Sequence, residues 1–132
     1  MKTTDLNIKR LVQIRIAAGE DILEGLNEAV EAESIQTGVI VNGLGSATSY
    51  HFHVVASTDL PPKEAFPRGA GPFDIVSMSG AVIDGRVHAH ISFSDTEKVF
   101  GGHLEPGCTA LTFAIITIAD VGEADLSGWD RT

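Results

Sequence analysis

Cysteine is nearly absent from this chain: Cys108 is the only one in 132 residues, which excludes an intrachain disulfide. A lack of disulfides is typical of proteins in a reducing compartment. Pro106 and Gly107 precede Cys108, so this segment predicts a turn, and no motif of cysteine catalysis surrounds the thiol. We therefore favour a structural cysteine over a reactive one.

Long apolar runs are also missing, and no stretch approaches the roughly 18 residues that a membrane-spanning helix requires. The polar residues 1–10 lack the apolar centre of a secretory signal. We expect a cytoplasmic protein with no membrane partner.

Basic residues are scarce. The chain has 9 Lys and Arg against 18 Asp and Glu, a net charge of −9, and its only adjacent basic residues are Lys9 and Arg10. DNA is a dense line of phosphates, so a protein without a basic patch binds it against electrostatic repulsion. Direct DNA binding by this chain is not expected.

What the chain does contain is typical of a globular fold, with 43% hydrophobic and 20% charged residues. Its length suits one domain over residues 1–132. We expect the core of this domain at about residues 10–119 and an acidic, peripheral tail at residues 120–132.

The first elements are a strand and a helix. Apolar residues alternate with other residues up to residue 17, which predicts a half-buried strand. Asp21 can then cap a helix, with Glu24 three positions later, and apolar residues at helical spacing predict an amphipathic helix over about residues 21–34. Gly25 weakens that helix, so tertiary packing must stabilise it.

Strands dominate the rest. Residues 38–41 predict a buried strand running into a glycine-rich turn, Gly43-Leu44-Gly45. A phosphate-binding loop is not favoured there, because the following residues 50–55 are extended and not helical. Prolines and glycines predict a loop at residues 59–72. Three longer strands are expected at residues 73–83, 86–94 and 108–119, which makes the class α+β with a mostly antiparallel sheet.

The histidines carry the chemistry. His88 and His90 are two apart on a predicted strand, so they share a face, with Cα atoms about 6.6 Å apart. Two such imidazoles can reach one ion, since Zn–N bonds are about 2.0–2.1 Å. His103 could supply a third ligand, because the preceding Gly101 and Gly102 allow a close approach or a bulge that directs its ring. An exposed strand face also tolerates histidines without a metal, and the spacing leaves both interpretations open.

His51 and His53 form a second pair two residues apart. Tyr50 and Phe52 alternate with them, so a strand edge or a subunit contact is favoured over a metal site.

Several motifs together resemble a known family. They are Gly19-Glu20-Asp21-Ile22-Leu23, Gly38 to Ser46, Phe73 to Gly80, Gly85 to His90, Gly101-Gly102-His103-Leu104 and Gly107-Cys108. In this order they resemble the plants-and-prokaryotes conserved (PPC) domain, over roughly residues 10–119. The combination of H-x-H and G-G-H-L is the specific part.

The resemblance implies a strongly bent, mostly antiparallel sheet with one main packed helix, a homotrimer, and a fold similar to that of acetolactate decarboxylase. It also implies a divalent metal, usually taken as zinc, at the positions of His88, His90 and His103. This chain departs from the family at Ala114, which stands where many members carry a glutamate, and it has no AT-hook.

Two classes of function follow from the residues and the resemblance together. The first is a metal-binding trimer, either a small-molecule lyase or hydrolase, with its ligand near the metal and its catalytic residues not assigned. The second is a DNA-associated or regulatory protein that uses the domain for oligomerisation, or a trimeric scaffold without catalysis.

Overall fold

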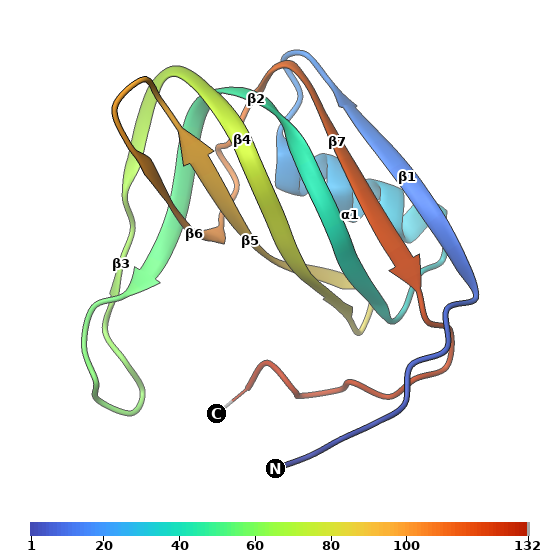
Figure 1. The fold of residues 1–132 in the computed structure, drawn as a ribbon. Coiled ribbons are helices and arrows are strands. Elements are labelled where there is room, and N and C mark those ends of the chain that lie inside the picture. The colour runs from blue at the N-terminus through green and yellow to red at the C-terminus, as the bar shows by residue number, and fades with distance from the viewer. Residues whose placement is uncertain (132) are drawn as a thin grey trace.

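A computed structural model describes residues 1–131 of the chain. In chain order the elements are β1 (Arg10–Ala17), α1 (Ile22–Ala32), β2 (Gly38–Val55), β3 (Glu64–Ala65), β4 (Arg68–Ile83), β5 (Arg86–Ser94), β6 (Val99–Leu104) and β7 (Ala110–Asp120). One helix among antiparallel strands confirms the predicted α+β class, and Figure 1 shows how strongly the long strands bend.

The strands form one sheet in the order β1-β7-β2-β4-β5-β6, and every pairing in it is antiparallel. The long strand β2 takes part twice. Its first part lies between β7 and β4, and its last part pairs with β6 through Phe52 and His53. The strands β2, β4, β5 and β6 therefore form a closed ring, and this closure positions the candidate site.

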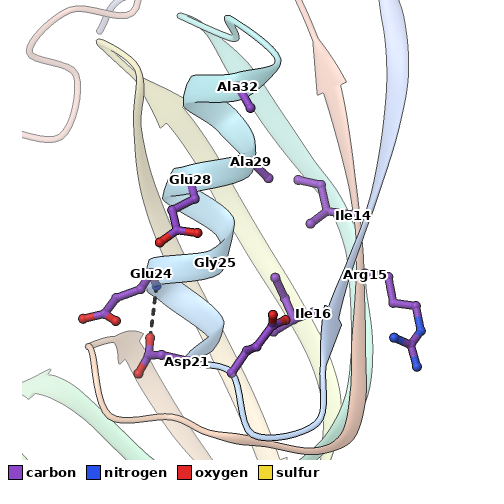
Figure 2. Close-up of a pocket in the computed structure, with 10 residues that line it drawn as sticks. Ile14, Arg15, Ile16, Asp21, Glu24, Gly25, Glu28, Ala29 and Ala32 are labelled. Carbon is purple, nitrogen blue, oxygen red and sulfur yellow. Dashed lines mark hydrogen bonds between the residues drawn. The ribbon is translucent and has the colours of Figure 1, made fainter.

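The helix covers one face of the sheet (Figure 1), where it packs mainly against β1 and β5. Asp21 caps it, since its carboxylate accepts a 3.0 Å hydrogen bond from the backbone N–H of Glu24 (Figure 2). Leu26 and Val30 are fully buried in the core together with Ile14 and Ile16 of β1. The predicted strand and helix are thus confirmed, with the helix ending two residues before its expected limit.

The predicted glycine-rich turn at Gly43-Leu44-Gly45 is wrong, because β2 continues through these residues without interruption. The glycines serve close packing between strands. A Cβ on Gly45 would collide with the backbone of Phe113 and Ala114 in β7, and one on Gly43 would lie 2.5 Å from the Cβ of Met78 in β4.

Two further boundaries differ from the sequence-based expectations. The expected loop over residues 59–72 ends early, because β4 begins at Arg68 and pairs with β2 from His51 onward. The segment before His103 forms the regular strand β6, which was not among the predicted strands, and Gly101 and Gly102 allow the close approach expected of them. Glycine marks a tight strand contact here, and a single sequence does not distinguish such a contact from a turn.

The segment after β7 runs back across the domain (Figure 1). Val121 and Leu126 are buried, and the Ser127 hydroxyl donates a 2.7 Å hydrogen bond to Asp84 in the turn between β4 and β5. This path carries Asp130 to the candidate site. Within residues 1–131, no helix has the length and apolar character to cross a membrane.

Candidate metal centre

His88 and His90 lie on β5, on the face opposite its buried side chains. The alternate residues Ala89, Ile91 and Phe93 are buried in the core, as the alternation predicts. His88 is half-buried and His90 is exposed. The strand thus presents both imidazoles on one side, while the packing of its other side fixes the backbone beneath them.

His103 lies on β6, directly opposite His90 of β5 and also directly opposite His53 of β2. His90, His103 and His53 therefore lie side by side on three neighbouring strands. His88 lies on the same face of β5, two residues before His90. In an antiparallel pair, directly opposite residues have Cβ atoms about 4.5–5.5 Å apart, so their rings meet.

The two glycines before His103 make this arrangement possible. A Cβ on Gly101 would overlap the carbonyl oxygen of Ile91 in β5. A Cβ on Gly102 would lie 2.5 Å from the carbonyl oxygen of His53 and 2.8 Å from side-chain carbons of Phe52 and Val54 in β2. Strand β6 can lie close to both neighbours only because these two positions lack side chains.

The structure brings His88, His90 and His103 together. The centre of the His103 ring lies 4.5 Å from that of His88 and 5.5 Å from that of His90, and the two β5 rings are 6.0 Å apart. One nitrogen from each of the three can be chosen so that all lie within 4.8 Å of one another. The three histidines that were expected to form a cluster thus lie close together in the structure.

The electrostatics keep two of these rings neutral. Burial, followed by the neighbouring His53 and His88, lowers the pKa of His103 to about 4, although Glu105 acts in the opposite direction. Although part of the His90 side chain is exposed, partial desolvation of its ring, followed by the neighbouring His88 and His53, also lowers the pKa of His90. A neutral imidazole keeps a free lone pair at pH 7, which is the form that binds a metal.

The donor set fits a divalent ion. Two nitrogens on one tetrahedral zinc lie about 3.3 Å apart, given Zn–N bonds of about 2.05 Å. Side-chain rotations close the remaining gap, and three neutral histidines leave a fourth position for water or substrate, as in catalytic zinc sites. The residues present therefore fit the metal that the resemblance implies.

A cleft of about 480 Å³ opens beside this cluster and is lined by both His88 and His103. Asp130 lies in it, with a carboxylate oxygen 3.3 Å from Nδ1 of His88. A carboxylate on one ring nitrogen commonly orients a metal-binding histidine and fixes which nitrogen faces the ion. Arg86 and Arg131 also line the cleft, so a small anionic or carbonyl compound has polar partners there.

Sequence reasoning missed His53 and Glu105. His53, expected at an edge or a subunit contact, stacks on His103 with ring centres 4.3 Å apart, and its Nδ1 lies 2.6 Å from a carboxylate oxygen of Glu105. No local pattern shows this, because it depends on β2 pairing with β6. His51, by contrast, bonds to the carbonyl of Pro106 and joins no such cluster among the described residues.

Two other sequence features remain outside the site. Ala114, where a glutamate is common in the resembling family, is fully buried and contributes no polar group. Cys108 is fully buried, and its thiol donates to the carbonyl of His51 at 3.2 Å. Burial raises the pKa of this thiol to about 11, which agrees with a structural role.

Comparison with known families gives a match over most of the chain: the family described as the Plants and Prokaryotes Conserved (PCC) domain matches residues 4–122. Among curated proteins, a protein named Bifunctional protein GlmU from Synechococcus sp. is 27% identical over 113 residues. That match covers 84% of this chain but only 17% of the GlmU protein.

Solved structures share the fold. A plant- and prokaryote-conserved (PPC) protein from Pyrococcus horikoshii superposes with a TM-score of 0.79 at 25% identity, over 96% of this chain and 89% of its own. The metal-containing protein AF0104 from Archaeoglobus fulgidus gives 0.80 at 20% identity, over 94% and 89%. A Staphylococcus aureus protein described as similar to alpha-acetolactate decarboxylase gives 0.58 at 11% identity, over 98% and 62%, which confirms the expected likeness of fold.

Proposed function

The chain belongs to the Plants and Prokaryotes Conserved domain family, and from this premise we propose that it is a metal-binding protein that holds one divalent cation, zinc, on His88, His90 and His103. The observation that carries the proposal is the convergence of three ring nitrogens within 4.8 Å from two paired strands. The metal in the similarly folded archaeal protein agrees with it.

The surroundings of the cluster favour small-molecule chemistry by a lyase or a hydrolase. A divalent ion at such a site supplies Lewis-acid polarisation of an oxygen atom or lowers the pKa of a bound water. The chain itself supplies the cleft beside His88 and His103, in which Arg86 and Arg131 can bind and orient a carbonyl or carboxylate compound. Asp130 holds the ring of His88 in position.

The proposal extends to a single cytoplasmic domain that assembles as a homotrimer. Leu11 of β1, Leu44 of β2 and Leu111 of β7 are 63%, 44% and 42% exposed, on the sheet face opposite α1. These leucines share that face but are spread along the strands, so the trimer is proposed from the likeness to the family. The excess of 9 negative charges argues against DNA as the partner, so a gel shift at about 50 mM salt should show no complex.

Metal analysis of protein purified without a polyhistidine tag tests the proposal. The expected result is one tightly bound zinc per chain after reconstitution. The His88→Ala/His90→Ala variant should not bind zinc with this high affinity. His51→Ala is the matched control, because it removes a histidine outside the cluster and should keep the ion. Less than about 0.2 ion per wild-type chain at neutral pH would overturn the proposal.

A further inference from the structure

A second group of metal-binding side chains lies next to the first. His53, His103 and Glu105 each offer a ligand atom, and these atoms also lie within 4.8 Å of one another. We propose that these three residues form a second cation position, which shares His103 with the first. A neutral imidazole binds one ion through its one free nitrogen, so either position can be filled alone, and filling both at once requires the His103 N–H proton to leave to solvent.

The backbone around the second position is firmly held. His53 of β2 and His103 of β6 are directly opposite residues in an antiparallel pair. Glu105 follows β6 immediately, and its N–H donates a 3.1 Å hydrogen bond to the carbonyl of His51, which continues the pairing by one step. The three side chains therefore come from paired strands and not from a mobile loop.

Burial and charge both favour a cation there. The side chains of His53 and Glu105 are only 20% and 24% exposed. Within residues 1–131, the half-buried carboxylate of Glu105 has His53 as its side-chain partner, and no lysine or arginine forms an ion pair with it. A second carboxylate, that of Glu64, lies 3.6 Å from Nε2 of His53 and adds negative charge on the far side of the ring.

Two histidines and one carboxylate are a common ligand set for divalent metals, including zinc. Nδ1 of His53 and the Glu105 oxygen are 2.6 Å apart, a hydrogen-bond distance that a shared proton explains. Two such donors on one tetrahedral ion lie about 3.3 Å apart. Binding through Nδ1 of His53 therefore requires a small outward movement of Glu105 and the ring tautomer that carries its hydrogen on Nε2, the nitrogen that lies 3.6 Å from Glu64.

This position goes beyond the proposed function and does not depend on it. His53 and Glu105 lie on the other side of His103 from His88 and His90, so the second position keeps all its ligands when the first is removed. The His88→Ala/His90→Ala variant therefore isolates it.

The experiment is a titration of that double variant with Co²⁺, following visible absorption and dialysis equilibrium. We expect about one Co²⁺ per chain, bound more weakly than in the wild type. Adding Glu105→Gln should raise the Kd at least about tenfold, because a ligand is lost while side-chain size is kept. Glu97→Gln, the same change in the exposed turn before β6, is the matched control and should leave the Kd unchanged.

Two outcomes would overturn this proposal: a double variant that binds no Co²⁺, or one whose Kd does not respond to Glu105→Gln. In either case His53 and Glu105 form only a hydrogen bond. Loss of the tight ion between wild type and double variant tests the first position separately. If the alanine pair does not fold, as judged by circular dichroism, His88→Asn/His90→Asn provides the same background.

Discussion

Gly102→Ala should damage the site although it adds only one methyl group. The added Cβ would lie 2.5 Å from the carbonyl oxygen of His53 and 2.8 Å from Phe52 and Val54 side-chain carbons. Carbon and oxygen atoms in contact normally stay more than about 3.3 Å apart. Strand β6 must therefore move away from β2 by nearly 1 Å, at the residue that precedes His103.

Overpacking of this kind costs about 1–3 kcal/mol of folding free energy. The unfolding entropy of a 132-residue chain is about 280 cal/mol/K, from about 2.1 cal/mol/K per residue. Each kcal/mol thus lowers the Tm by about 4 °C, and we expect a decrease of about 4–11 °C for Gly102→Ala.

Thermal unfolding followed by circular dichroism in the presence of a chelator measures this decrease without any contribution from bound metal. Gly25→Ala is the matched control, because its Cβ meets only the flexible end of Ile16 and it gains helix propensity. The control should keep the wild-type Tm within a few degrees and keep its metal affinity. A Gly102→Ala protein with wild-type Tm and metal affinity would refute the argument that these glycines permit the β2–β6 contact.

Two further predictions concern buried titratable groups outside the site. Cys108 should resist iodoacetamide at pH 8 in the native protein and react fully in guanidinium chloride. The reason is that a pKa of about 11 leaves only about one thiol in a thousand ionised at pH 8. Equal labelling rates in the two conditions would contradict this prediction. Burial alone would raise the pKa of Asp120. Its carboxylate accepts hydrogen bonds from the N–H of Gly122 and from Arg10, and these bonds lower the pKa below its usual value. A carboxylate whose pKa is lower in the folded state than in the unfolded state stabilises the fold at pH values above its unfolded-state pKa. This stabilisation is lost as the pH falls through the folded-state pKa. The Tm deficit of Arg10→Gln at pH 7 should therefore shrink at about pH 3, and a deficit independent of pH would show that the pair does not stabilise the fold.

The sequence by itself determined the local features. Alternation of apolar residues predicted β1 and the two faces of β5, and the capping residue Asp21 predicted where α1 begins. The spacing of His88 and His90 predicted that they share a face, because the side-chain period of a strand is two wherever the strand lies. These properties depend on neighbouring residues only, so they can be read from one chain.

Only the tertiary structure decided which residues of different strands lie opposite one another. The pairing of β6 with both β5 and β2 places His103 between His90 and His53, and it brings Glu105 within reach of His53. Glycine has the same local signature in a turn and in a tight strand contact, so the sequence suggested a turn at Gly43 and Gly45 where β2 continues as a strand. The register between β2 and β6 joins residues about 50 positions apart, such as His53 and His103, and no local pattern contains that information.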